Sequence, residues 1–425
     1  MNHMKTIAII LFVLTYILLM FLPKYRAYIA LLAAAIFVVI GAMPLGHIFG
    51  AINWNVIMMI AGTMGVVALF IESRMPARMA DIMIEKLPDV KWAIIALSLF
   101  AGFISAFVDN VATVLMVAPI ALTISKKLGI SPVKSIIAIA ISSNLQGAAT
   151  LVGDTTSILL GGYANMDFLD FFYYKGQPGM FFVVEISALV ATAVLLLIFR
   201  KENKPISGLE REVVEDYFPS YLLLFMVLML IMASFLPVKP SITNGIICTS
   251  LFAIGMGRNV LKYREKGAIK RYLKEVDYFT ILLLVGLFVV IGALTEVGVV
   301  KDIANIFVSI SGDNIFVIYS LLLWVSVLLS AFIDNIPYIA TMLPVTASIA
   351  SILGVDPTVL YFGLLSGATL GGNMTPIGAS ANIAGLGILR RAGYEVKPGE
   401  FMKISVPFTL AAVLVGYGLV WFFWG

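Results

Sequence analysis

Residues 105–158 of this chain recur at residues 330–383, at a constant offset of 225 positions and without a gap. The first segment opens with the string SAFVDN and the second with SAFIDN. Fifteen of the 54 aligned positions are identical, and they include aspartate, asparagine, proline, glycine and threonine, residues that apolar helices normally avoid. Chance similarity between apolar segments would be limited to leucine, isoleucine and valine. The chain therefore uses one structural unit twice.

The composition places this unit in a membrane. Hydrophobic residues make up 61% of the chain and charged residues 12%, where a soluble domain has roughly 25% charged residues. Apolar runs of about 20 residues, the length that crosses a bilayer, recur along the chain. The net charge of +4 lies in the loops, so no nucleic-acid partner is expected. The single cysteine, Cys248, excludes a disulfide framework and a thiolate metal site.

Each half of the chain is expected to contain five membrane spans and one re-entrant hairpin. Two apolar segments, 92–125 and 314–350, are too long for one span and are broken by Asp-Asn, which indicates hairpins that enter the membrane and return. The predicted divisions are a first repeat at 1–199, a cytoplasmic linker at 200–217 and a second repeat at 218–425. The predicted spans are 6–22, 25–43, 52–71, 134–160, 180–199, 218–237, 240–257, 276–296, 358–389 and 404–423.

The distribution of basic residues indicates that the two repeats have opposite orientations. The loop 42–53 has no lysine or arginine, whereas the matching loop 258–275 has seven. Residues 72–91 contain four bases, against one in 297–313. Because basic loops stay in the cytoplasm, this reversal predicts inverted repeats with both termini on the non-cytoplasmic side. The expected fold is an all-α polytopic membrane protein with two inverted repeats of about five transmembrane helices plus one re-entrant helical hairpin each.

Polar residues at the two breaks form the candidate site. Inverted repeats with helices broken near the membrane midplane are typical of secondary transporters, because broken helices expose backbone groups that can bind an ion or substrate. Two Asp-Asn pairs at the hairpin breaks and a Gly-x-x-Thr-x-x-Gly pattern on each following arm supply carboxylates, amides and hydroxyls. The candidate ion- and substrate-binding residues are Asp109, Asn110, Thr113, Asn144, Gly147, Thr150, Asp154, Asp334, Asn335, Asn373, Thr375, Ser380 and Asn382. A sodium ion is considered at Asp109, Asn110, Asn144, Asp334, Asn335 and Asn373.

Each hairpin aspartate has a simpler interpretation as a helix cap. Asparagine would cap equally well without the charge, which favours a role in ion binding. No lysine or arginine is expected in the middle of a span, and His3 and His47 lie near span ends, which excludes a buried histidine relay. Each carboxylate therefore has to be protonated, cation-bound or solvated, since a lone charge in the bilayer costs at least about 2.5 kcal/mol.

The strings at 107–114, 147–154 and 371–382 resemble the ion-transporter superfamily, in particular the branch of the arsenical-pump membrane proteins and the melanosomal P protein. The resemblance covers nearly the whole chain. It implies a scaffold part and a transport part that bears the hairpins, elevator-like motion and a homodimer. Sodium–dicarboxylate relatives have Ser-Asn-Thr at the hairpin tips, whereas this chain has Asp-Asn-Val at 109–111 and Asp-Asn-Ile at 334–336. That departure favours coupling through titratable carboxylates.

The leading hypothesis is a proton- or sodium-coupled secondary transporter of a small anion or oxyacid, with arsenite- or antimonite-type export as its most specific form. The alternatives are a sodium/proton antiporter and a sodium-coupled di- or tricarboxylate symporter. An enzyme is not expected, because the sequence lacks a His-Glu zinc pattern, a nucleophile–base pair and a nucleotide loop. The expected setting is a prokaryotic plasma membrane, with lipid and a second copy of the chain as partners and no cofactor beyond the coupling H⁺ or Na⁺.

Overall fold

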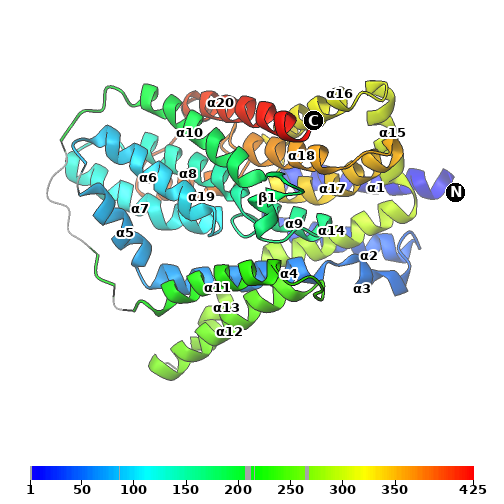
Figure 1. Ribbon diagram of the computed structural model, residues 1–425, viewed down its shortest axis with the longest axis horizontal. Coiled ribbons are helices and arrows are strands. Elements are labelled where there is room, and N and C mark those ends of the chain that lie inside the picture. The colour runs from blue at the N-terminus through cyan, green and yellow to red at the C-terminus, as the bar shows by residue number, and fades with distance from the viewer. Residues whose placement is uncertain (1, 86, 206–211, 215, 264–267) are drawn as a thin grey trace.

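The computed structural model describes residues 2–85, 87–205, 212–214, 216–263 and 268–425, so the predicted linker 200–217 is described only in part. The protein is an all-α polytopic membrane protein built from two inverted repeats (Figure 1). The first repeat contains α1 (Asn2–Phe21), α2 (Arg26–Val39), α3 (Ile48–Ala51), α4 (Trp54–Glu72), α5 (Met75–Ile84), α6 (Val90–Ser105), α7 (Asn110–Leu128), α8 (Val133–Gln146), α9 (Thr155–Ala164) and α10 (Met180–Ile198). The second contains α11 (Phe218–Ser234), α12 (Thr243–Tyr263), α13 (Ala268–Lys274), α14 (Tyr278–Glu296), α15 (Val299–Ser311), α16 (Ile315–Ser330), α17 (Asn335–Leu353), α18 (Thr358–Gly371), α19 (Ser380–Arg391) and α20 (Pro398–Trp424). A short antiparallel pair, β1 (Tyr173–Tyr174) and β2 (Gln177–Pro178), precedes α10.

The internal repeat holds at the level of helix boundaries. The helices α6, α7, α8 and α9 begin 225 residues before α16, α17, α18 and α19, respectively. Each pair of arms, α6–α7 and α16–α17, is joined by a break of four residues. The arms α6 and α7 pack against each other, whereas α17 packs mainly on α15 and α18. In both repeats the first arm also packs along the next helix, α6 on α8 and α16 on α18. These shared contacts show that the sequence repeat is a structural repeat.

The helices form two groups. The scaffold group consists of α2, α4, α11, α12 and α14, in which α4 packs along α12 and α2 along α14, so that each repeat packs against the other. Small residues allow these close contacts: a Cβ on Gly62 would lie 2.3 Å from the Cys248 carbonyl carbon, and one on Gly286 would lie 2.6 Å from that of Ala30. The hairpin group consists of α6–α10 and α16–α20, and α5, α15 and the linker connect the groups.

Several predicted spans are shorter or interrupted in the structure. In the described part of the chain, seven helices are individually long and apolar enough to cross a membrane, or eight if the pair α15–α16, bent by 118°, counts as one span. The predicted spans 134–160 and 358–389 are each two helices separated by a break, and the predicted span 25–43 contains α2, which has only 14 residues. Hydropathy alone cannot detect these interruptions, because the residues at each break are small and mostly apolar.

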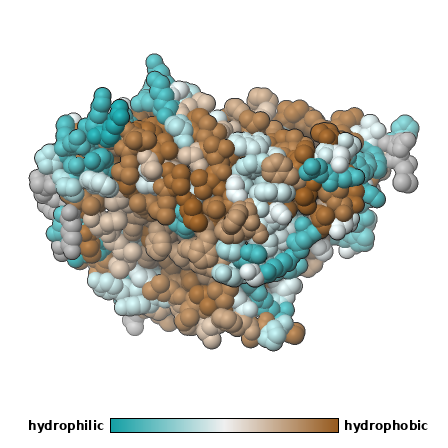
Figure 2. Space-filling view, turned by 45° about the horizontal axis from the view of Figure 1, so that its top comes forward, coloured by the Kyte–Doolittle hydropathy of each residue, from teal (hydrophilic) through white to brown (hydrophobic). Residues whose placement is uncertain are grey.

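Ion pairs outside the membrane join loops that share a face of the molecule. On the basic face, at the left of Figure 1, the pairs are Arg74–Glu212, Lys134–Glu202, Arg258–Asp216 and Arg271–Glu72. The opposite face holds the N-terminus (Figure 1). The pairs among the loops on that side of the scaffold and hairpin groups are Lys5–Asp302, His47–Glu296, Lys175–Asp356 and Lys239–Asp167. Between the two faces a broad hydrophobic surface is visible, with hydrophilic residues concentrated toward the ends (Figure 2). The positive-inside rule makes the basic face the expected cytoplasmic one.

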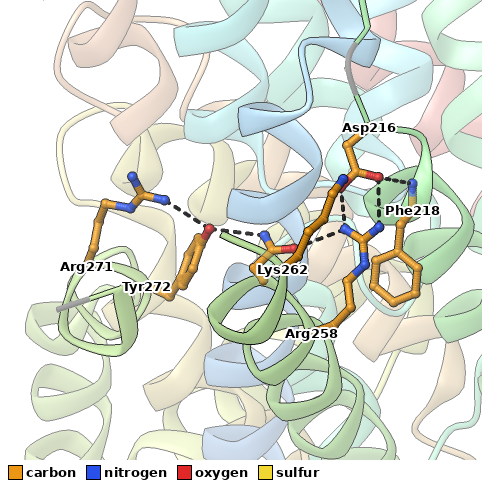
Figure 3. A network of polar contacts seen from close by, with 7 residues as sticks. Asp216, Phe218, Arg258, Lys262, Arg271 and Tyr272 are labelled. Atoms are coloured by element: carbon orange, nitrogen blue, oxygen red, sulfur yellow. Dashed lines mark hydrogen bonds and ion pairs between the residues drawn. The ribbon is translucent and has the colours of Figure 1, made fainter. Parts of the chain in front are cut away.

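The end of the linker is fixed to the scaffold group by a polar network. Asp216 accepts hydrogen bonds from Arg258 and Lys262 of α12 and from the backbone nitrogen of Phe218, at the start of α11 (Figure 3). Burial opposes ionisation of Asp216, but the bonds from Arg258 and Lys262 outweigh it and hold the pKa of this carboxyl far below its ordinary value. The ionised carboxylate therefore stabilises the folded chain above the ordinary aspartate pKa, and this contribution is lost as the pH falls through the lowered pKa.

Candidate functional site

The two hairpin tips present their aspartates as helix caps. Asp109 Oδ1 accepts the backbone N–H groups of Val111 and Ala112 at 3.0 and 3.1 Å, and Asp334 Oδ1 accepts that of Ile336 at 3.2 Å. Capping thus uses one oxygen of each carboxylate. Capping is therefore one part of the role of each aspartate, and it leaves the second carboxylate oxygen to contact other groups.

The break on each following arm packs against its hairpin tip in the same way. Thr150 Oγ1 donates to the Ala106 carbonyl, and Thr375 Oγ1 donates to the Ala331 carbonyl, 225 residues later. The repeated glycines are required by space: a Cβ on Gly153 would lie 2.5 Å from the Gly147 carbonyl oxygen, and one on Gly378 2.6 Å from that of Gly372. Both threonine hydroxyl protons are thus used to hold the tips in place.

A chain of buried amides joins the two repeats. Asn110 Nδ2 donates to Asn144 Oδ1 at 2.9 Å, and Asn144 Nδ2 donates to Asn373 Oδ1 at 3.1 Å and to the Thr369 carbonyl at 2.9 Å. Asn373 Nδ2 in turn donates to the Ile141 carbonyl at 2.8 Å. Three of the predicted sodium ligands are therefore adjacent, although their amide protons stabilise the junction between the repeats.

Asp154 lies where the first break meets the second hairpin tip. Its side chain is 3% exposed, and its Oδ2 accepts a bond from Thr156 Oγ1 at 2.9 Å and a long one from Asn335 Nδ2 at 3.5 Å. Thr156 also bonds Thr369 of the second repeat, at 3.2 Å. No lysine, arginine or histidine of the described residues forms an ion pair with Asp154. Its donors are thus neutral, and they come from both repeats.

Asp334 has a basic partner that was not expected from the sequence, in which no lysine or arginine falls in the middle of a span. Arg26 Nη1 donates to Asp334 Oδ2 at 2.9 Å, and Ser380 Oγ donates to the same oxygen at 3.0 Å. The two ion-paired side chains are 12% and 5% exposed. Arg26 is the first residue of α2, at the start of a predicted span, where arginine usually extends to the membrane surface. The short α1–α2 turn instead places it beside the second hairpin tip.

The other predicted residues have mainly structural partners. Thr113 Oγ1 donates to the Val108 carbonyl at 3.5 Å, and Asn382 Nδ2 donates to the Gly372 and Thr375 carbonyls, each at 3.1 Å. Gly147 lies against Asp154, since a Cβ at Gly147 would be 3.2 Å from the Asp154 Cβ. Residues that sequence reasoning missed are Arg26, Thr156 and Thr369. For Thr156 the proximity to Asp154 in the sequence was an available signal, whereas Arg26 and Thr369 are brought in by folding.

A large cavity leads toward this site from the face that holds the N-terminus. Its volume is about 1480 Å³, and it lies between α4 and α14 of the scaffold group and α9 and α17 of the hairpin group. The innermost lining residues on the two hairpin-group helices are Leu159 and Ala340, four residues after Thr155 and five after Asn335. At 1.5 Å per residue the cavity ends roughly 6 to 8 Å along these helices from the site. The site is thus near a solvent path but not in it.

The residues 16–367, most of the chain, match the family described as "CitMHS: Citrate transporter". The chain belongs to the CitMHS family. An uncharacterized transporter of Mycobacterium tuberculosis (strain H37Rv) is 32% identical over 98% of each chain, and the human P protein is 27% identical over 97% of this chain and 59% of its own length. The resemblance to the superfamily is thereby confirmed, whereas the arsenical-pump branch is not.

Solved structures of transporters share the fold. The YdaH transporter of Alcanivorax borkumensis superimposes with a TM-score of 0.61 at 15% identity, covering 88% of this chain and 86% of that one. MtrF of Neisseria gonorrhoeae superimposes with a TM-score of 0.53 at 15% identity, covering 89% and 81%. Membership of the CitMHS family and this fold together make the chain an integral membrane transporter.

Proposed function

We propose that this transporter is a secondary active one, driven by a proton or sodium gradient, that moves a small anion or oxyacid by an elevator-like displacement of the hairpin group. The observation that carries the proposal is Asp154, a buried carboxylate with neutral donors contributed by both repeats. A lone carboxylate at such a place costs roughly 2.5–3.5 kcal/mol in the membrane unless a proton or cation accompanies it. Coupling requires a group that gains or loses a proton or another cation when its surroundings change.

The surroundings of Asp154 also suit an anion. Four helices, α7, α9, α17 and α19, begin at the hairpin tips or at the breaks, and helix N-termini carry partial positive charge. Free backbone N–H groups at such ends are ready ligands for carboxylate or oxyacid oxygens. The amide groups of Asn110 and Asn335 add polar contacts at the same tips.

The family description makes a citrate-like carboxylate the first substrate to test. Arsenite or antimonite remains the oxyacid alternative, and sodium/proton exchange without another substrate is the third. An elevator-like motion would move the hairpin group relative to the scaffold group. The two groups are joined covalently through α5, α15 and the linker, and these connections would accommodate the motion. We further propose a homodimer in a prokaryotic plasma membrane, with no cofactor apart from the coupling ion.

The test is uptake into proteoliposomes under an imposed pH or sodium gradient, with citrate, other dicarboxylates, arsenite, and sodium alone as separate arms. Asp154→Asn keeps the shape and removes the charge, so it should abolish gradient-driven movement in whichever arm is active. The matched control is Asp313→Asn, an exposed position in a left-handed conformation (φ 62°) that asparagine tolerates. Coupled transport that persists unchanged in Asp154→Asn would exclude Asp154 as the coupling group.

A further inference from the structure

The ion pair between Arg26 and Asp334 joins the scaffold group to the tip of the second hairpin. Arg26 belongs to α2, which packs along α14, whereas Asp334 caps α17 of the hairpin group. Its carboxylate Oδ2 receives the guanidinium and the Ser380 hydroxyl together, at 2.9 and 3.0 Å. With both side chains nearly buried, solvent screens this attraction little.

The guanidinium is held in position from its other end. Arg26 Nε donates to the Leu19 carbonyl at 3.0 Å, across the turn between α1 and α2. Earlier in α1, the Tyr16 hydroxyl donates to the Pro337 carbonyl at 2.7 Å, one turn beyond Asp334. Tyr16 in α1 and Arg26 at the start of α2 thus both bind the N-terminal end of α17.

The first repeat lacks this arrangement. Asp109, the counterpart of Asp334 at the offset of 225, forms no ion pair with any described residue, and its cap bonds are its only hydrogen bonds among them. The two carboxylates at equivalent tips therefore differ in their partners: Asp334 receives a cation supplied by the protein and the Ser380 hydroxyl, whereas Asp109 receives only backbone N–H groups among the described residues. An asymmetry within a symmetric pair of sites needs a reason beyond helix capping.

We propose that Arg26 is a tethered counter-ion that occupies the place of the coupling cation at Asp334 and latches the hairpin group to the scaffold group in this state. The hairpin group can carry Asp334 away from Arg26 only when another cation replaces the guanidinium. The latch thus opposes movement of the empty site, which is the condition for tight coupling. The role of the coupling cation rests on the proposed function, but the latch itself can be measured without transport.

The reporter is Ser348→Cys, on the α17 surface that lines the cavity. The native Cys248 is fully buried, so the parent chain without the reporter gives the background. In nanodiscs the rate of reaction with a soluble maleimide measures how much protein keeps this cavity open. Arg26→Gln and Asp334→Asn should each change the rate by about threefold or more, as a shift between two states of similar free energy would. In the double variant the labelling rate should change no more than in the single variant with the larger change, because both substitutions remove the same interaction.

Two further variants separate the latch from general damage. Lys5→Gln breaks the pair that Lys5 forms with Asp302, a more exposed pair (29% and 46%) that links α1 to α15, and it should leave the labelling rate within twofold of the parent. Arg26→Lys keeps the charge and should retain most of the parent rate. If Arg26→Gln does not yield monodisperse protein, Asp334→Asn and Arg26→Lys decide the question. A rate unaffected by loss of either charge, or additive effects in the double variant, would overturn the latch.

The cation is tested in the proteoliposome assay. Arg26→Gln should lower the half-activating concentration of the coupling cation about tenfold, since the competing guanidinium is gone. Altered labelling with no gradient-driven transport in the parent would leave the latch standing and reject the proposed function. Coupled transport whose cation dependence and labelling are both unaffected by Arg26→Gln would reject the latch alone.

Discussion

At the scale of single residues, three buried or half-buried carboxylates have three different environments. Asp109 caps α7 and has no other hydrogen bond among the described residues, Asp154 has only neutral donors, and Asp334 is paired with Arg26. From the sequence, both hairpin aspartates belong to the candidate site and neither has a basic partner in the middle of a span. The structure separates them, because a fixed cation neutralises Asp334, whereas no described residue forms an ion pair with Asp109.

This difference predicts unequal effects on stability. Asp334→Asn leaves the Arg26 guanidinium buried without its counter-charge, and breaking a buried pair in this way typically costs about 3–5 kcal/mol. Asp109→Asn leaves no orphaned charge, and asparagine caps a helix about as well as aspartate. We expect thermal unfolding in detergent to show a clearly lower midpoint for Asp334→Asn and little change for Asp109→Asn. Equal midpoints for the two variants would mean that Arg26 finds solvent or another acceptor.

At the scale of elements, each repeat is organised around a hairpin tip and the broken helix that packs on it. The same threonine-to-carbonyl bond and the same glycine contact occur in both repeats. These contacts involve backbone carbonyls, which cannot move without shifting the hairpin. The break is therefore a packed, specific structure rather than a loose interruption of a helix.

A single methyl group tests this packing. Gly153→Ala would place a Cβ within 2.5–2.7 Å of three backbone carbonyl oxygens, and Gly378→Ala within 2.6–2.8 Å of three. Such overpacking should destabilise the protein by about 1–3 kcal/mol in each repeat, seen as a lower unfolding midpoint. The matched control is Gly257→Ala in α12, where a Cβ meets nothing within 4 Å and alanine favours the helix. A control that unfolds as early as the two test variants would contradict the packing argument.

At the scale of the whole molecule, inversion of the repeats determines which loops share a face. Among the described residues, the ion pairs outside the membrane that are named above connect loops within one face, while the pair of Arg26 and Asp334 lies between the faces. The cavity opens on the face that holds the N-terminus.

Orientation in the cell follows from the basic face. A cysteine at Lys274, the exposed last residue of α13, should react with an impermeant maleimide only when the cytoplasmic side is accessible. A cysteine at Leu45, 78% exposed before α3, should react from outside in intact cells. The buried Cys248 again gives the background. Labelling of both positions from one side would contradict the assigned orientation and the opposed faces.

The sequence by itself determined the architecture and named most members of the candidate site. An exact offset of 225 residues fixed the equivalence of the two hairpins, and polar residues within apolar segments identified the breaks, because such residues are costly in lipid unless they bind something. Tertiary structure alone decided how these residues are paired. Arg26 lies 308 residues from Asp334 in the chain, and Asn144 lies 229 from Asn373, so no local pattern links them. Hydropathy reports the free-energy cost of placing a residue in the membrane. The partner of that residue depends on which helices meet at the same depth, and helix packing decides which helices meet.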